Sequence, residues 1–378
     1  MRGAPRRGPV AVLFRRAAIE ESLRILVVKP SSLGDIVHTF PAVALLRQTA
    51  PKAIIDWVVA DNLADTAAMC PGGVSRLVVF PRKQLHSFHL GCLGALWRGL
   101  RQESYAAIID FQGLLRSGLM SRIARSPLRI GFAHAREGAP LFYTHKVALP
   151  TELRQAHAAE KNLHLMRAAL NLLELPIPQA VPDAPPTLPA GWRDRALAKL
   201  TACGLAGDGP LIAVAASSRW ESKSWPATFF AAVLTRLAGR RPDARIWLLG
   251  APGEDAERAA HVVAALDDEA TRRAVRNLAG QTTIAEMTAL LASSQAMLTN
   301  DSGPMHIAAA LHVPCVALFG ATDDRLTGPY GPPGRHTVIR SHCPQSPCFR
   351  RQCPRDGHPC AEGLDPAEVA RLLEQKLE

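Results

Sequence analysis

The amino-acid sequence predicts an α/β protein made of two doubly wound, Rossmann-like domains that face a central cleft. Short apolar runs typical of buried parallel strands alternate with longer segments of helical period along two stretches of the 378-residue chain. A proline-dense segment without periodicity, Pro176–Trp192, separates the two stretches. The chain length also suits two domains with sizeable cores.

The predicted elements alternate in the same way in both stretches. Apolar runs predict strands over residues 24–30, 53–60, 76–81 and 105–113, and then over 209–218, 244–250, 295–301 and 313–320. Helical periodicity predicts helices over residues 35–50, 159–175, 227–242 and 304–312, and one that begins at Asp255. Asp365, followed directly by Pro366, is a typical cap that opens a last helix.

We expect six segments along the chain. They are a flexible extension (1–22), a first Rossmann-like domain (23–175), a Pro-rich linker (176–192), a second Rossmann-like domain (193–340), a Cys-rich loop (341–362) and a C-terminal helix (363–378). The apolar part of the extension is too short for the core of a secretory signal peptide. No apolar run reaches the length of a membrane-spanning helix, so we expect a cytoplasmic protein.

The chain is basic, with a formal net charge of +11 and a pI near 9.6. Such a surface attracts nucleic acid, anionic lipid and phosphorylated sugars. Only 5% of the residues are aromatic, and no basic run is interleaved with stacking side chains. Single-stranded nucleic acid is therefore a disfavoured partner.

Ligands of open parallel sheets bind beyond the carboxyl ends of the strands, where this sequence places four polar segments. In the first segment, Asp35 follows Gly34 at the start of a helix, and it either caps that helix or acts as a general base. In the second, Ser217, Ser218 and Lys223 either form a solvated loop or donate hydrogen bonds to a phosphate.

The other two segments also lie between a strand and a helix. Glu254 is either a simple helix-start carboxylate or the acceptor of ribose hydroxyls. Asp301, Ser302 and Gly303 precede a helix whose first amides can cradle a diphosphate, and His306 lies one turn further. The sequence has neither a GxxxxGK[ST] loop nor a GxGxxG turn after a strand, which argues against a P-loop NTPase and a nicotinamide dehydrogenase.

With these segments in this order, the chain resembles the heptosyltransferases of glycosyltransferase family 9, which build the inner core of lipopolysaccharide. The resemblance runs from Arg24 to the C-terminal helix. It is carried by "KPSSLGDIVHTFPA", "YAAIIDFQGLLRSGL", "HAAEKNL", "SSRWESKSWP", "LLGAPGEDAE" and "NDSGPMHIAAALHVPCVALFG". It implies a GT-B fold with an acceptor-binding first domain and a nucleotide-sugar-binding second domain.

The resemblance also implies the reaction and its partners. Heptose would pass from ADP-L-glycero-D-manno-heptose to a lipid A-linked core oligosaccharide, with inversion and without a metal or another cofactor. The enzyme would act at the cytoplasmic face of the inner membrane, in peripheral contact with it, and would bind no nucleic acid. The alternative is a member of the same family that uses a different nucleotide sugar or an acceptor outside lipopolysaccharide.

Matching positions take their roles from the same resemblance. Asp35 would remove the proton of the acceptor hydroxyl, and Lys223 would neutralise the departing diphosphate. The other donor-binding residues would be Ser217, Ser218, Glu254, Asp301, Ser302, Gly303 and His306, and the acceptor-binding residues would be Ser32, Gly34, His38 and Arg116.

Four of the eight cysteines crowd one stretch, as Cys343, Cys348, Cys353 and Cys360. Their spacing, C-x4-C-x4-C-x6-C, is not that of a standard zinc finger, although four thiols can bind a structural zinc ion. Reduced thiols in a surface loop are the alternative. A metal there would have no catalytic role.

Overall fold

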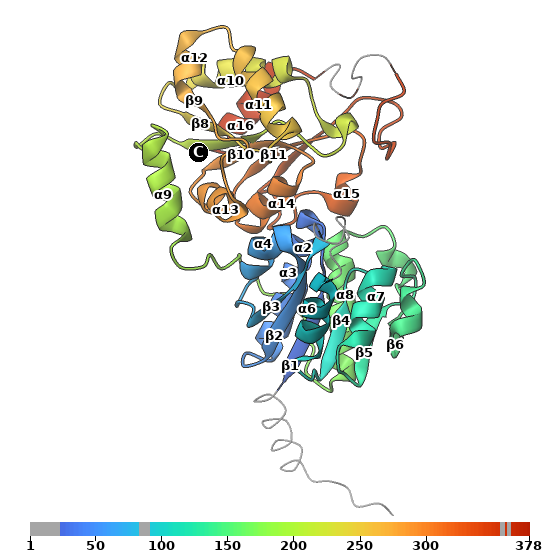
Figure 1. The fold of residues 1–378 in the computed structure, drawn as a ribbon. Coiled ribbons are helices and arrows are strands. Elements are labelled where there is room, and N and C mark those ends of the chain that lie inside the picture. Colours follow the sequence, from blue (N-terminus) through green and yellow to red (C-terminus); the bar gives the residue numbers. More distant parts are fainter. Residues whose placement is uncertain (1–22, 83–90, 356–359, 361–363) are drawn as a thin grey trace, which may run out of the picture. The chain divides into compact units, whose positions relative to one another are not determined.

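The computed structural model describes residues 23–82, 91–355, 360 and 364–378. The predicted extension (1–22) and part of the Cys-rich loop lie outside the described residues. The chain divides into two compact units, each with one six-stranded sheet (Figure 1). Unit 1 holds the chain up to Ser31, Thr39–Arg154 and Ala159–Thr187, and unit 2 holds Ser32–His38, Gln155–Ala158 and Leu188–Glu378.

The sheet of unit 1 has the strand order β3-β2-β1-β4-β5-β6, and every pairing in it is parallel. Its strands are β1 (Arg24–Val28), β2 (Ile54–Ala60), β3 (Arg76–Phe80), β4 (Ala107–Asp110), β5 (Leu128–Phe132) and β6 (His145–Val147). The central strands β1 and β4 are buried almost throughout, as expected for a parallel sheet with both faces covered. The four strands predicted for this stretch are confirmed.

Helices flank this sheet. They are α3 (Phe40–Thr49), η1 (Asp61–Leu63), α4 (Ala64–Ala68), α6 (Gly91–Arg101), α7 (Leu115–Ile123), η2 (Ala139–Phe142), η3 (Thr151–Leu153) and α8 (Ala158–Leu172). The chain passes from β1 through β2 to β3 in one direction across the sheet, and after β3 it returns to β4 and continues in the opposite direction. Right-handed crossovers therefore place the helices before β3 and those after β3 on opposite faces of the sheet. The helices α6 and α7 therefore share one face, where they lie side by side (Figure 1).

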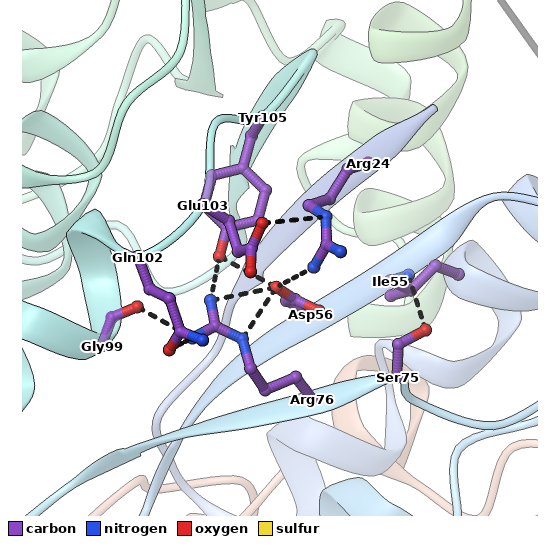
Figure 2. Close-up of polar contacts among 9 residues, drawn as sticks. All are labelled: Arg24, Ile55, Asp56, Ser75, Arg76, Gly99, Gln102, Glu103 and Tyr105. Carbon is purple, nitrogen blue, oxygen red and sulfur yellow. Dashed lines mark hydrogen bonds and ion pairs between the residues drawn. The ribbon is translucent and has the colours of Figure 1, made fainter. Parts of the chain in front are cut away.

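A buried ionic network ties the amino-terminal part of this sheet together (Figure 2). The side chain of Asp56 in β2 is fully buried, and its Oδ2 accepts hydrogen bonds from Arg24 (3.1 Å), Arg76 (3.1 Å) and the hydroxyl of Tyr105 (3.0 Å). Burial raises the pKa of Tyr105, and the Asp56 charge raises it further, so the hydroxyl keeps the proton that it donates. Three donors on one oxygen offset the cost of burying this carboxylate.

The sheet of unit 2 has the strand order β12-β11-β10-β7-β8-β9, again with parallel pairings. Its strands are β7 (Leu211–Ala215), β8 (Arg245–Leu248), β9 (Val275–Asn277), β10 (Ala296–Asn300), β11 (Cys315–Phe319) and β12 (Thr337–Arg340). The predicted strands of this stretch are confirmed as β7, β8, β10 and β11.

The helices of unit 2 include one from the beginning of the chain. They are α2 (Leu33–Val37), α9 (Trp192–Ala202), η4 (Glu221–Lys223), α10 (Ala227–Arg240), α11 (Glu254–Ala264), α12 (Glu269–Ala274), α13 (Ile284–Ala292), α14 (Gly303–Ala310), α15 (Asp324–Thr327) and α16 (Pro366–Glu374). The last helix, α16, packs on α10 and buries Val369 and Leu373 in the core. Asp365 caps it, as predicted, by accepting the N–H of Ala367 at 2.8 Å.

One predicted helix is wrong in its extent. The single helix expected over residues 35–50 is two helices, α2 and α3, separated at His38 and Thr39. Pro41 explains the break, because proline lacks an N–H and clashes with the carbonyl four residues earlier inside a helix. In the structure Pro41 stands in the first turn of α3, where that N–H is not needed.

Candidate functional site

The carboxyl ends of β7, β10 and β11 bring polar residues together at one edge of the sheet of unit 2. β10 runs between β7 and β11, so the segments that follow these strands are neighbours. Ser217 and Ser218 come shortly after β7, Asp301 directly follows β10, and Thr322 lies just beyond β11. Three predicted donor-binding residues therefore meet here, together with Thr322, which the sequence pattern did not single out.

An ion pair lies at the centre of this group. Lys223 Nζ is 2.6 Å from Asp301 Oδ2, and both side chains are largely buried. Thr322 Oγ1 donates to the same carboxylate oxygen at 2.6 Å, and Ser218 Oγ donates to the main-chain carbonyl of Asp301 at 2.7 Å. The carboxylate thus holds a lysine cation at a fixed point, where screening by water is reduced.

The loop that carries Lys223 is held by a segment that the sequence pattern did not connect with it. Lys223 Nζ lies 4.5 Å from the centroid of the Trp220 ring, in cation–π geometry. Ser222 donates its main-chain N–H to the carbonyl of Arg351 at 3.2 Å and its hydroxyl to the carbonyl of Arg350. Both arginines belong to the Cys-rich loop, so that loop supports the lysine.

The N-terminus of α14 faces the same edge of the sheet. Ser302 is its N-cap, but the Ser302 hydroxyl bonds to the Thr299 hydroxyl at 3.0 Å and does not cap the helix amides. Gly303 and Pro304 form the first turn. Amides at such a helix start favour an anion. Asn300, just before it, is fully buried and has no hydrogen-bond partner for its side-chain amide within the described residues, an uncommon arrangement in a protein interior.

Asp35 lies in unit 2, because the segment that carries α2 packs on α14. Its Oδ2 accepts the Ser32 N–H at 3.0 Å and the Ser32 hydroxyl at 2.6 Å, which forms a capping box. Gly34 allows α2 to approach His306 closely, since a Cβ at this position would lie 2.8 Å from His306 Nε2. Asp35 therefore takes part in capping α2 as the third residue of the capping box, with Ser32 as the N-cap, and its role as a base stays a proposal.

Three histidines from separate parts of the chain form a contiguous group. His38 Nε2 lies 3.0 Å from His306 Nδ1, and the His38 ring meets the His157 ring edge-on, with centroids 4.8 Å apart. His157 in turn stacks on Tyr330 at 4.9 Å and bonds through Nε2 to the carbonyl of Gly328 at 3.1 Å. His38 is buried in this group, an environment that suits a positioning role better than contact with an acceptor.

His306 is neutral at physiological pH. Burial lowers its pKa to about 4; Asp301 and Asp35 act in the opposite direction, while His157 and Lys223 lower the pKa further. A neutral imidazole carries one N–H, so His306 either donates to His38 or accepts from it. The His306 imidazole therefore adds no positive charge to that of Lys223.

Glu254 takes the first position of α11, exposed to solvent, beyond the end of β8. The neighbouring Asp255 accepts the N–H of Ala251 at 2.9 Å and so shapes the turn before the helix. The hydrogen bonds and ion pairs among the described residues do not connect Glu254 with Lys223 or Asp301. The ribose-binding role of Glu254 stays a prediction.

Unit 1 has its own pocket at the carboxyl ends of its strands. Arg116, predicted to bind the acceptor, lines this pocket together with Arg82, which sequence reasoning missed. The guanidinium of Arg116 lies 5.9 Å from the Phe80 ring centroid. The buried Asp110 holds the pocket loop through its Oδ1, which accepts the N–H of Gln112 at 2.8 Å. Two cations among the lining residues suit an anionic ligand.

The four clustered cysteines are all free. In the part of the chain that the structure describes, no group of three or more His, Cys, Asp or Glu side chains is arranged to hold a metal ion. Burial raises the pKa of Cys360, and the nearby thiols raise it further, which favours the protonated thiol. Of the two possibilities for these cysteines, a structural zinc ion is not supported.

A family model and a sequence relative both connect the chain with the heptosyltransferases. The model of glycosyltransferase family 9 (heptosyltransferase) matches residues 93–358. The lipopolysaccharide heptosyltransferase 1 of Pseudomonas aeruginosa is 30% identical over 377 residues, which cover 94% of this chain and 98% of that protein.

Two solved structures from E. coli are each similar to 94% of the chain. The ADP-heptose lps heptosyltransferase II has a TM-score of 0.73 and 24% identity, covering 94% of this chain and 98% of its own. Heptosyltransferase WaaC with ADP has a TM-score of 0.71 and 24% identity, and the match covers 94% of this chain and 100% of that one. The fold is GT-B, as the resemblance implied.

Proposed function

This chain belongs to glycosyltransferase family 9 and is a glycosyltransferase, and we propose that it transfers heptose from ADP-L-glycero-D-manno-heptose to the inner core of lipopolysaccharide. The names of the relatives support this donor and acceptor, since they are lipopolysaccharide heptosyltransferases and one was solved with ADP. One observation carries the proposal. The helix α2, which carries Asp35, packs on α14 in the same compact unit as the Lys223–Asp301 pair, and this supports the proposed roles of Asp35 as the base and of Lys223 as the leaving-group cation.

The donor diphosphate would bind at the start of α14. Lys223, positioned by Asp301, supplies the cation, and the amides at Ser302 and Gly303 supply further donors. Ser217 and Ser218 would add hydroxyl contacts. Glu254 would hold the ribose, as the resemblance implies. Fixed positive potential of this kind stabilises a departing diphosphate without a divalent cation, so we propose metal-independent transfer.

The chemical step is a single displacement. The Asp35 carboxylate takes the proton of the acceptor hydroxyl while that oxygen attacks the anomeric carbon. The bond from this carbon to the diphosphate breaks with its electron pair, and ADP leaves beside Lys223. Attack opposite the leaving group inverts the anomeric configuration. His38 and His306 hold α2 in place and so position the base.

The acceptor would enter the pocket of unit 1, where Arg82 and Arg116 would meet its anionic groups. Ser32 and Gly34, at the start of α2, would contact the sugar that carries the attacking hydroxyl. The acceptor is lipid-linked, so we propose that the protein works at the cytoplasmic face of the inner membrane. Within the described residues, no helix is both long and apolar enough to span a membrane.

The experiment compares wild type with Asp35→Asn, using ADP-heptose and either Kdo-lipid A or its heptosylated form as the acceptor. We expect wild-type transfer to one acceptor, insensitive to EDTA, with an inverted anomeric centre by NMR. The variant should lose transfer by more than a hundredfold yet bind ADP normally in calorimetry, because removing a general base costs about 10²–10⁴-fold. Transfer only from another nucleotide sugar would overturn the assignment of the donor, and an active Asp35→Asn would remove Asp35 from the mechanism.

A further inference from the structure

Exposed apolar side chains gather on one face of unit 1. The described residues include nine large hydrophobic side chains that are exposed, and five of them lie on α6, α7 and η2. These five are Leu93, Trp97, Leu115, Leu119 and Leu141. The three elements are neighbours, since α7 packs against both α6 and η2. We call these elements, with their outward side chains, the α6–α7 surface.

The helical periodicity aims these side chains away from the sheet. In α6, Leu96 and Leu100 are buried while Trp97 is 50% exposed. In α7, Met120 is buried while Leu119 is 47% exposed. Because both helices cover the same face of the sheet (Figure 1), their exposed rows point to the same side. Solvent-exposed rows of Leu and Trp on adjacent helices are unusual for a surface that contacts only water.

The charges on the two helices have one sign. Their sequences, GCLGALWRGLR and LRSGLMSRI, contain four arginines (Arg98, Arg101, Arg116 and Arg122) and neither Asp nor Glu. The ion pairs among the described residues involve none of these four. The carboxylates that contact α7 come from other segments: Glu137 accepts the N–H of Leu115 at 3.2 Å at the helix start, and the buried Asp110 is hydrogen-bonded to the Ser117 side chain.

Arginine and aromatic side chains are also combined within α6. The Arg101 guanidinium lies 5.4 Å from the Trp97 ring centroid. A half-exposed tryptophan with leucines and arginines matches the composition of helices that lie in the interface of an anionic bilayer, where the apolar side chains enter the headgroup region and the arginines meet phosphates.

The same surface is continuous with the acceptor pocket. The first turn of α7 contributes Arg116 to the pocket and Leu115 to the α6–α7 surface. A lipid-linked acceptor would keep its acyl chains in the bilayer while its sugar headgroup entered the pocket. From the apolar rows, the uniform positive charge and this continuity, we propose that the α6–α7 surface docks unit 1 on an anionic lipid bilayer. This inference rests on the proposed function for its choice of acceptor, but not for the lipid contact itself.

The test uses the full chain and vesicles of phosphatidylethanolamine with about one third phosphatidylglycerol, compared with vesicles of phosphatidylcholine alone. We expect sedimentation with the anionic vesicles and loss of binding at high salt. Arg98→Gln, Arg101→Gln and Arg122→Gln combined should weaken the partition coefficient about a hundredfold, since each arginine near an anionic surface contributes roughly fivefold. The double variant Trp97→Gln/Leu119→Gln should also release the protein.

A matched control lies on α9, where Arg193 and Leu197 are exposed one turn apart. Arg193→Gln/Leu197→Gln should bind the vesicles as wild type does. Wild-type binding by the α6–α7 variants, or no binding of wild type, would overturn the inference. So would a dimer that only these variants dissociate in gel filtration, because the surface would then cover a second copy of the chain.

Transfer measured with a detergent-dispersed acceptor separates this inference from the proposed function. The α6–α7 variants should keep their kcat there and lose activity only on acceptor embedded in vesicles. A wild-type protein that transfers heptose without binding vesicles would refute the surface alone. One that binds vesicles without transferring heptose would refute the function alone.

Discussion

Replacing Gly34 by alanine tests whether the close approach of α2 to His306 sets the position of Asp35. The added Cβ would overlap His306 Cδ2 and would lie 2.8 Å from Nε2, whereas ordinary contacts begin near 3.4 Å, so α2 or the ring must move by about 1 Å. Misplacing a catalytic group by about 1 Å can cost roughly a hundredfold in rate, so we expect kcat to fall by about tenfold or more. Overpacking should cost about 1–3 kcal/mol of unfolding free energy, of which alanine's better helix propensity returns about 1 kcal/mol.

The assay is steady-state ADP release, with ADP affinity measured by calorimetry and stability measured by urea unfolding. Gly239→Ala is the matched control, because Gly239 also lies in a helix of unit 2 and a Cβ there would meet nothing within 4 Å. This control should keep its rate and gain slight stability. If Gly34→Ala retained the wild-type kcat, the packing of Gly34 on His306 would not determine the position of the base, and our reasoning about α2 would be wrong.

Three further perturbations probe the ion pair, the buried imidazole and the core network. Lys223→Ala should raise the KM for the donor and lower kcat by about 10²–10³-fold, as the loss of a hydrogen-bond donor to the transition state does. An unchanged kcat would mean that another group neutralises the departing diphosphate. Because the pKa of His306, about 4, lies below its ordinary value of 6.5, the unfolded chain binds more protons between these values. The unfolding free energy should therefore fall by about 3 kcal/mol as the pH drops through this range. In urea melts at a series of pH values, His306→Gln should reduce this dependence of the unfolding free energy on pH. An unchanged dependence in the variant would contradict the lowered pKa of His306. Asp56→Ala should cost about 3–5 kcal/mol of unfolding free energy, whereas Glu103→Ala, which removes a half-exposed partner of Arg24 at 3.7 Å, should cost less than about 1 kcal/mol. Equal midpoints for these last two variants would show that the buried network adds no stability.

The fold was predictable because its central strands are almost wholly apolar. β1, β7 and β11 each have a neighbouring strand on both sides, and burial on both faces of the sheet selects continuous runs of Val, Ile, Leu and Ala. The edge strands β6, β9 and β12 are short and half-exposed, so they have no such run and were not predicted. The amphipathic α6 also escaped notice, because its glycines dilute the helical signal.

The sequence predicted a binding site only where a single short segment contains all the groups that the site needs. The residues after β10 carry a cap, a glycine and a helix start in one run, and this pattern indicates an anion site by itself. The Lys223–Asp301 pair joins residues far apart in the sequence, and nothing local indicates their contact. The same holds for the contact of His38 with His306 and for the support of Ser222 by Arg350 and Arg351. These contacts form because the strand order of the sheet brings distant segments of the chain together, and the local sequence does not reveal them.

The discontinuous make-up of unit 2 has a consequence for engineering. A fragment that began at Leu188 would lack residues 32–38 and 155–158 of unit 2. It would therefore lose α2, which covers Gly303, and the adjacent imidazoles of His38 and His157. Chimeras that exchange unit 2 between relatives should therefore transplant three separate stretches of gene together. Joining the two halves at the proline-rich linker alone would pair each α14 with an α2 from the wrong parent.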